Sequence, residues 1–447
     1  MGELQLKRAK FLILTTLLYL LPPTFRLINA LRRGIPLTAP LDSLESLLTA
    51  NFVGKSSDTF LYYLPPAYSI LKYGEPIRVV GDRIYHLCYR VVQSYVFLPF
   101  MAMFGGYFPI YYIFTFSLLF GLLLGLLLLE LNPDRYALNS LLSALILPVA
   151  FYYLPFLMLE APTSVLLLAY AIFLVRYVKR RSVVDALLSL PFLMGAVFLR
   201  PETVLLALPL LYLTFRRRLL FVLSLLSLSV PVAVHVGHAV RCGDQSNFYL
   251  WAYALHVERE RGEPYTDVAD LIRDAGEDLQ RCLRERGVED PSVLGFGDRK
   301  LNLYFQMFQT NGREYSACFR RLLFQSVGVG DVWTTVKRVP MNLLSLLVPS
   351  FASSPFYRKV GLLKWPFKAL FGVYGVLIIF AIMCSWACGG AGYRWVVASY
   401  LLLLIIYALY NPFGGFDALR FKMYLLPFEA VFLGLTLRAF ISPHSTE

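Results

Sequence analysis

Two carboxylates next to apolar segments are the residues of this sequence best suited to chemistry. Asp58 lies in a polar loop after the first apolar run, just before the aromatic pair Tyr62 and Tyr63. Glu160 opens a later apolar run. A carboxylate can accept a proton from a hydroxyl or an amine, and it can also bind a divalent cation. If both acids lie on one side of a membrane, they predict a two-carboxylate site at the bilayer surface, with the two tyrosines as substrate contacts.

Three basic residues are candidates for binding an anionic group in the same site. Arg200 precedes Pro201-Glu202, with Glu202 as a further substrate contact, and Arg420 and Lys422 precede the last apolar run. Arginine binds phosphate bidentately, and such contacts stabilise a leaving group that gains charge. A phosphate leaves without a general acid, so a single base such as Asp58 suffices to transfer a sugar from a phosphate carrier.

The acids also have purely structural interpretations. Asp58 follows two serines and can N-cap a helix that begins near Thr59. Glu160 can favour the first turn of its own helix through the helix dipole.

The basic residues have structural interpretations as well. Arg200-Pro201-Glu202 can be a helix break with a local ion pair. Arg420 and Lys422 can extend along the apolar surface with their charges at the membrane interface. The functional interpretation rests on all these groups meeting at one face.

The composition indicates an integral membrane protein. Hydrophobic residues make up 57% of the 447-residue chain and charged residues only 16%, and the mean hydropathy is +0.59. Several apolar runs reach the roughly 18–20 residues that cross a bilayer. The net charge of +13 is therefore assigned to cytoplasmic loops and membrane lipid contacts, not to nucleic acid binding.

We predict an all-α polytopic membrane protein with about ten transmembrane helices. The apolar runs that carry this prediction are 11–30, 108–131, 137–153, 162–178, 183–199, 202–215, 219–237, 366–388, 395–410 and 424–441. The run 91–104 is too short to span and ends in Gly105-Gly106, so it is predicted to be an amphipathic helix in the outer interface.

Loop charges predict the topology. With both termini in the cytoplasm, the basic loops at 176–181 and 216–218 are also cytoplasmic, as the positive-inside rule requires. The candidate site residues then all lie on the outer face. We also expect no ionisable group near the middle of a span, which argues against a transporter.

The predicted organisation has three parts. Residues 1–237 form a transmembrane catalytic module with a large first outer loop, 31–107; residues 238–335 form a helical extracytoplasmic insertion; residues 336–447 return to the membrane. If the insertion is extracytoplasmic, its cysteines can include one disulfide. The candidates for this bond are Cys242, Cys282 and Cys318.

The order of these motifs resembles the GT-C glycosyltransferase superfamily, in particular its protein mannosyltransferase and aminoarabinose transferase-like branch. The resemblance covers most of the chain except 238–335. The motifs that carry it are Asp58-Thr59-Phe60-Leu61-Tyr62-Tyr63-Leu64, Phe104-Gly105-Gly106, Met158-Leu159-Glu160, Phe198-Leu199-Arg200-Pro201-Glu202 and Leu419-Arg420-Phe421-Lys422-Met423-Tyr424.

The resemblance implies roles for individual residues. Asp58 would be the catalytic carboxylate and Glu160 would help to shape the site, while Arg420 and Lys422 would bind the carrier phosphate. Many members carry paired acids where this chain has Asp58-Thr59, so a divalent cation (Mg²⁺ or Mn²⁺) is an open expectation.

The resemblance also implies an activity. The expected donor is a polyprenyl-phosphate monosaccharide, and the acceptor is a lipid, protein or glycan on the outer face, with inversion at the sugar. The signature Trp-Trp-Asp is absent from the sequence, which argues against transfer of a whole glycan to asparagine. Two alternatives stay open: a lipid-linked-sugar flippase or other transporter, and a polyprenyl-diphosphate glycan ligase or polymerase.

Overall fold

The fold consists of two compact units, each assembled from segments that are far apart in the sequence. A computed structural model describes residues 2–56, 59–88, 90–242, 249–250, 253–254, 256–257, 268–326, 329–348, 364–410 and 418–441. Unit 1 comprises Met1–Gly34, Tyr112–Ala233 and Arg338–Glu447, and unit 2 comprises Ile35–Tyr111 and Val234–Lys337. The predicted division at 237/238 and 335/336 lies near these boundaries. The prediction placed the 31–107 loop in the membrane module, whereas the structure assigns Ile35–Tyr111 to unit 2.

Unit 1 is a bundle of apolar helices. Its helices are α1 (Gly2–Arg32), α6 (Phe108–Leu131), α7 (Tyr136–Tyr153), α8 (Glu160–Arg180), α9 (Val183–Leu199), η3 (Pro201–Ala207), α10 (Leu208–Thr214), α11 (Arg218–Cys242), α17 (Val329–Leu347), α19 (Lys364–Cys388), α20 (Ala391–Tyr410) and α21 (Ala418–Ile441). Three of them, α6, α11 and α17, cross the boundary and are assigned to unit 1 only from Tyr112, up to Ala233 and from Arg338, respectively. Every apolar run predicted as a span coincides with one of these helices or, for 202–215, with η3 followed by α10.

Six helical segments among the described residues are long and apolar enough to cross a membrane. They are Glu3–Arg32, Val91–Leu131, Glu160–Arg180, Arg218–Val240, Lys368–Cys388 and Ala391–Leu409. The shorter apolar helices are Tyr136–Phe151, Val183–Leu199 and Pro201–Thr214. An all-α membrane protein is therefore supported, while the number of ten spans stays a prediction.

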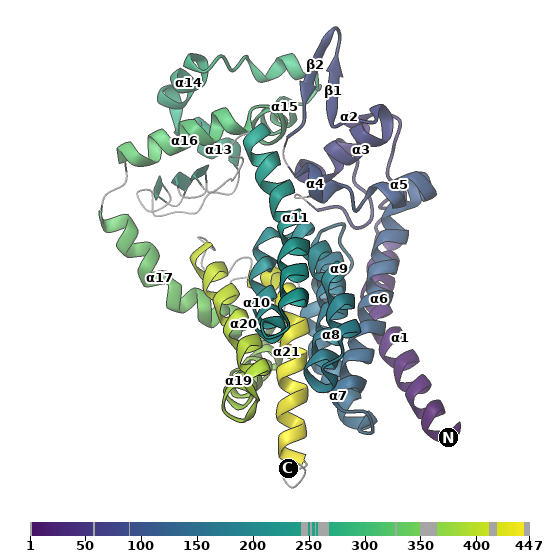
Figure 1. Ribbon diagram of the computed structural model, residues 1–447. Helices are drawn as coiled ribbons and strands as arrows, with labels where there is room; N and C mark the ends of the chain where they lie inside the picture. Colours follow the sequence, from purple (N-terminus) through teal and green to yellow (C-terminus); the bar gives the residue numbers. More distant parts are fainter. Residues whose placement is uncertain are drawn as a thin grey trace. The chain divides into compact units, whose positions relative to one another are not determined.

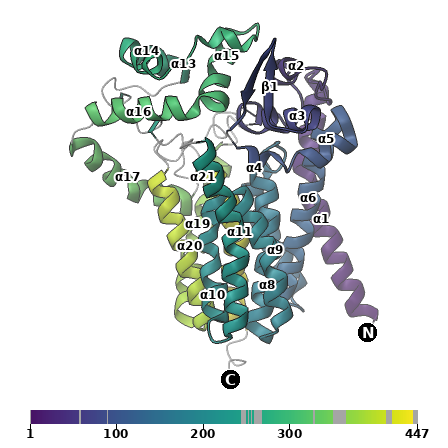
Figure 2. The same cartoon turned by 45° about the horizontal axis from the view of Figure 1, so that its top comes forward.

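Antiparallel packing organises the bundle. α8 and α9 form a helical hairpin, and α21 packs against α7, α8 and α19 (Figures 1 and 2). The beginning of α1 and the end of α21 lie at the same end of unit 1 in both views. Since α8 and α9 run in opposite directions, the first residue of α8 and the residue after α9 also share one end.

A small-residue motif lets α6 approach α1 closely. A Cβ added at Gly121 would lie 2.9 Å from the Cβ of Tyr19 and 3.0 Å from the Cα of Thr16, and one at Gly125 would lie 3.0 Å from Leu12. Two glycines four residues apart present one flat helix face, which is a common interface in membrane bundles. Larger side chains at these two positions would force the helices apart.

Unit 2 contains short helices and one β-hairpin. Its elements are α2 (Leu44–Thr49), η1 (Thr59–Tyr63), α3 (Leu64–Tyr73), β1 (Ile77–Val80), β2 (Arg83–His86), α4 (Val91–Ser94), α5 (Leu98–Phe104), η2 (Gly105–Tyr107), α13 (Val268–Asp274), α14 (Gly276–Glu285), η4 (Pro291–Leu294), α15 (Arg299–Phe305), η5 (Gln306–Thr310) and α16 (Gly312–Ser326). The described part of the predicted insertion is thus helical.

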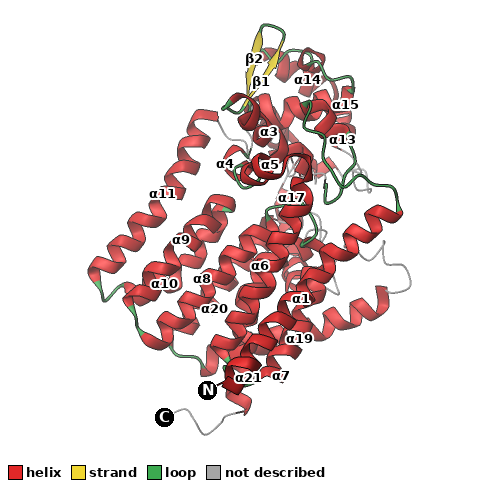
Figure 3. Cartoon of the chain, turned by 90° about the vertical axis from the view of Figure 1, so that its right-hand side faces the viewer, coloured by secondary structure: helices red, strands yellow, loops and turns green. Residues whose placement is uncertain are grey.

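The hairpin and the stretch 91–104 differ from expectation. β1 and β2 pair antiparallel, with Val80 opposite Arg83 across the turn Gly81-Asp82, where Gly81 has a φ of +57° (Figure 3). A glycine followed by aspartate between two short runs rich in β-branched or aromatic residues, here Ile77–Val80 and Arg83–His86, is a hairpin signal that the all-α prediction overlooked. The stretch 91–104 is two short helices, α4 and α5, and not one continuous helix.

Two disulfides hold unit 2 together. Cys282 in α14 is bonded to Cys318 in α16, and Cys88 is bonded to Cys242. The first bond confirms that the polar segment contains a disulfide. The second joins Cys242, one of the three candidates, to Cys88, which was not a candidate and lies 154 residues away in the sequence.

Removing the Cys282–Cys318 bond should destabilise the α14–α16 region. The bond spans 36 residues. Closing a loop of that length lowers the entropy of the unfolded chain, which stabilises the folded state by about 3–4 kcal/mol at room temperature. The double variant Cys282→Ser/Cys318→Ser should therefore be cleaved faster between 268 and 326 in limited proteolysis. Cys384→Ser, which replaces a free cysteine of α19, is the control. Equal rates of cleavage between 268 and 326 in the double variant and the control would contradict the expectation.

Candidate functional site

Glu160, Arg200 and Tyr424 form a buried cluster at one end of unit 1. Glu160 is the first residue of α8, Arg200 directly follows α9, and Tyr424 comes from α21. The Arg200 Nη2 donates to Glu160 Oε1 at 2.9 Å, and the Tyr424 hydroxyl donates to the same oxygen at 2.8 Å. Glu160 is 0% exposed and Arg200 6%. The antiparallel α8–α9 hairpin brings the two charges together.

Further contacts fix the geometry of this cluster. The guanidinium carbon of Arg200 lies 5.0 Å from the centre of the Tyr424 ring, a cation–π distance. The Ser164 hydroxyl donates to the carbonyl of Met423 at 2.7 Å, which ties α8 to α21 beside the ion pair. The Tyr112 hydroxyl donates to the carbonyl of Met158 at 2.7 Å and holds the chain before α8.

The ion pair of Arg200 is therefore made with Glu160, whereas the structural interpretation of the sequence paired it with Glu202. Glu202 Oε1 accepts a long contact of 3.5 Å from the Tyr407 hydroxyl. Glu160 has Leu159 as its N-cap residue and begins α8. Its carboxylate thus combines two favourable interactions, one with the helix dipole and one with the guanidinium.

A second buried cluster lies midway along α21 and is centred on Glu429. Its Oε1 accepts from Lys422 Nζ at 2.5 Å and from the Tyr400 hydroxyl at 2.6 Å, and its Oε2 accepts from the Tyr374 hydroxyl at 2.5 Å. Both charged side chains are 0% exposed. The three donors come from α19, α20 and α21, so one carboxylate joins three helices.

This cluster corrects the expectation that the spans carry no internal charge. Glu429 lies inside the predicted span 424–441 and was overlooked there, although a single acid in an apolar run is itself the signal of a buried, paired group. Lys422 was expected at the outer surface. It is instead buried, pairs with Glu429 and donates to the carbonyl of Leu347 at 3.2 Å, so it is neither an exposed phosphate ligand nor an interfacial side chain.

The remaining predicted site residues are distributed as follows. Asp58 lies outside the described residues. Arg420 belongs to the first turn of α21, and its side chain is not described. Tyr62 and Tyr63 belong to η1 in unit 2. Tyr63 is 1% exposed and stacks on Phe97 at 6.0 Å between ring centres, so it is a core residue of that unit.

Tyr62 is the more accessible of the two tyrosines. It is partly exposed and makes an edge contact with Phe308, with 5.0 Å between the ring centres.

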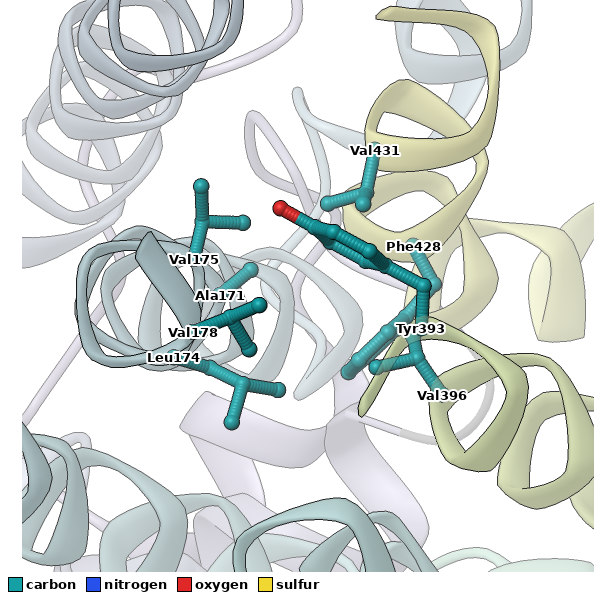
Figure 4. A pocket seen from close by; sticks show the side chains of 8 residues that line it. All are labelled: Ala171, Leu174, Val175, Val178, Tyr393, Val396, Phe428 and Val431. Carbon is teal, nitrogen blue, oxygen red and sulfur yellow. The ribbon is translucent and has the colours of Figure 1, made fainter. Parts of the chain in front are cut away.

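No metal cluster is found in the parts of the chain that the structure describes, and the apolar space inside the bundle between α8, α20 and α21 is small. No three His, Cys, Asp or Glu side chains gather among the described residues as a cation would require, so the divalent cation stays a prediction. Between α8, α20 and α21, Val175, Tyr393 and Phe428 help to line an apolar space of about 10 Å³ (Figure 4). That volume is about one water molecule, too small for a substrate.

The fold and these clusters define the chain as a helical membrane protein with ion pairs buried in its bundle. Comparison with known proteins gave no match: no family model matches the sequence, and no curated protein or solved structure is similar to it.

Proposed function

We propose that the protein is a glycosyltransferase that moves a monosaccharide from a polyprenyl-phosphate carrier to a lipid, protein or glycan acceptor. The observation that carries this proposal is the Glu160–Arg200–Tyr424 cluster at the end of the bundle. A guanidinium held in place by a carboxylate and an aromatic ring is a preorganised cation for a phosphate. A guanidinium has five N–H donors and can bind a carboxylate and a phosphate at the same time.

In the proposed reaction the acceptor oxygen or nitrogen attacks the anomeric carbon, and the bond from that carbon to the phosphate oxygen breaks. The phosphate leaves with the electron pair, and the acceptor proton passes to Asp58. Arg200 and Arg420 stabilise the departing phosphate, while Glu160 orients Arg200. Attack from the face opposite the phosphate inverts the sugar. A divalent cation, if bound, would neutralise phosphate charge.

The proposal is tested by offering the purified protein defined donors. Protein in nanodiscs receives polyprenyl-phosphate monosaccharides with a labelled sugar, together with a membrane extract as the source of acceptor. Release of polyprenyl phosphate and transfer of label to the acceptor are measured. Donor identity is checked by mass spectrometry of co-purified lipid. Polyprenyl-diphosphate donors serve as the comparison, and turnover of those alone would favour a ligase or polymerase.

The Lys422–Glu429 pair favours a second candidate function, transport of a lipid-linked sugar. Buried ionisable groups midway along apolar helices are typical of ion- and proton-coupled transporters. Movement of labelled donor across a liposome membrane, without cleavage of the sugar–phosphate bond, would support this function. Cleavage without net movement would support the enzyme.

Replacing Arg200 with alanine should lower turnover by about 30- to 1,000-fold. The loss corresponds to about 2–4 kcal/mol of transition-state stabilisation from a charge-assisted phosphate contact. Arg200→Lys should recover only part of it, because an ammonium lacks the planar fork of the guanidinium. Arg394→Ala, an exposed arginine of α20, is the control. Equal turnover in the Arg200 and Arg394 variants would show that the phosphate is held elsewhere.

The membrane orientation is tested without reference to activity. Single cysteines near Asp58, near Glu160 and within 268–326 should react with membrane-impermeant reagents in intact cells. Cysteines placed in 176–181 and 216–218 should react only after lysis, because their basic loops are predicted to be cytoplasmic. Labelling of the 176–181 loop in intact cells would reverse the predicted topology.

A further inference from the structure

The end of unit 1 where α8 ends carries a dense cationic cluster around one acid. Glu130 Oε2 accepts from Arg176 Nε at 3.1 Å, and its Oε1 lies 3.4 Å from Arg180 Nη2 and 3.9 Å from Lys179 Nζ. Lys179 also donates to the backbone carbonyl of Glu130. Arg438, in the last turn of α21, lies close enough to repel Lys179. Three cations thus share one carboxylate, and a fourth adds to the repulsion.

Helix capping and topology alone do not account for this arrangement. Cations at the end of α8 and α21 do interact favourably with the helix dipoles. However, Arg176, Lys179 and Arg180 are spaced three and four residues apart on one helix face, where like charges repel. Among the described residues, Glu130 is the only carboxylate within 4 Å of these cations. At least two positive charges therefore lack a compensating carboxylate among the described residues.

We propose that Arg176, Lys179, Arg180 and Arg438 form a binding site for the phosphate group of an anionic membrane lipid. A phosphate would pair with the guanidinium forks and relieve the repulsion that Glu130 only partly offsets. The cluster joins the ends of α6, α8 and α21, and α8 is apolar enough to cross a membrane. Lipid head groups are concentrated at the ends of membrane-spanning helices, whereas soluble phosphate is not.

The exposure of the side chains suits a head group at the bundle surface. Glu130 is 12% exposed, Lys179 26%, Arg176 31% and Arg180 61%. The acid thus lies innermost, and the cations surround it on the outer side. The acyl chains would lie along the outside of the bundle, since the space beside Tyr393 is too small to receive them.

The test measures lipid retention by the full-length protein. The purified protein is mixed with vesicles of dioleoyl phosphatidic acid or of dioleoyl phosphatidylcholine, and bound lipid is counted by native mass spectrometry. We expect a preference for phosphatidic acid that falls about tenfold or more in Arg176→Gln/Lys179→Gln. Glu130→Gln should raise retention severalfold, because it removes the competing anion and keeps the cations.

The matched control is Arg217→Gln/Arg218→Gln, which removes the same charge from the exposed start of α11 and the residue before it. An equal loss of phosphatidic acid retention in this control would show that the lipid is attracted by the overall positive charge, and it would overturn the proposed site. A loss in Glu130→Gln as large as that in Arg176→Gln/Lys179→Gln would show that the cluster only clamps α6 to α8. Full displacement of the lipid by about 10 mM inorganic phosphate would overturn the assignment to a lipid.

Discussion

Replacing Asp58 with asparagine should reduce sugar transfer by about 10²- to 10⁴-fold, the usual contribution of a positioned general base. Asparagine keeps the size of the side chain and its ability to cap a helix, but it cannot accept the acceptor's proton. A helix cap would therefore survive the change, whereas a base would not. Donor binding should stay close to that of the unmodified protein, since the carrier phosphate is assigned to arginines.

The matched control for this variant is Asp42→Asn. Asp42 is an exposed acid in the same loop region, and its carboxylate accepts from the Ser46 hydroxyl at 2.9 Å. Initial rates of transfer and donor affinity are measured side by side for both variants. If the Asp58 variant keeps a substantial fraction of its activity, Asp58 is not the base, and the resemblance to the GT-C superfamily loses its main support.

Replacing Glu429 with glutamine should destabilise the bundle by about 3–5 kcal/mol, because it leaves Lys422 as an unpaired charge among apolar helices. The two tyrosines donate to different oxygens of Glu429, and the amide of glutamine keeps only one acceptor oxygen. The loss therefore includes one tyrosine contact as well as the broken ion pair. The double variant Lys422→Met/Glu429→Gln removes both charges and should recover most of the stability.

Both variants are compared by equilibrium unfolding in mixed micelles at fixed detergent composition. If Glu429→Gln lowers the free energy of unfolding by less than about 1 kcal/mol, the pair is not buried, because such small contributions are typical of exposed ion pairs. The double variant also separates the two functions. An enzyme that uses the pair only to hold its helices should keep transfer activity, whereas a transporter that uses the pair for coupling should lose transport.

Local sequence signals predicted the helices, since an apolar run of about 20 residues has few alternatives to a helix. The end of α3 at Gly74 also follows from a local signal, because glycine readily adopts a φ of +76°, and its backbone N–H donates to the carbonyl of Ile70 as a C-terminal cap. The sequence also named Cys282 and Cys318 among three candidates for a disulfide, and these two are bonded, but it did not select the pair.

The features that the sequence did not predict depend on contacts between residues far apart in the chain, which the spacing of residues in the sequence does not reveal. Cys88 and Cys242 are far apart in the chain. Arg200 has an acid two residues away in Glu202, yet its ion pair is with Glu160, because the α8–α9 hairpin returns the chain to the same end of the bundle. Sequence proximity favoured the wrong partner, and only the packing of helices selects the right one.

Helix α21 carries both Lys422 and Glu429, about two turns apart on the same helix, and this has a consequence for biogenesis. A single charge near the centre of a membrane helix costs about 2.5–3.5 kcal/mol during insertion. Because the two opposite charges reach each other within one helix, the segment enters the lipid nearly neutral and needs no other helix to compensate it. The tyrosines of α19 and α20 then fix the position of a helix that is already in the membrane. Moving the lysine to a neighbouring helix would make insertion of the last segment depend on assembly of the bundle.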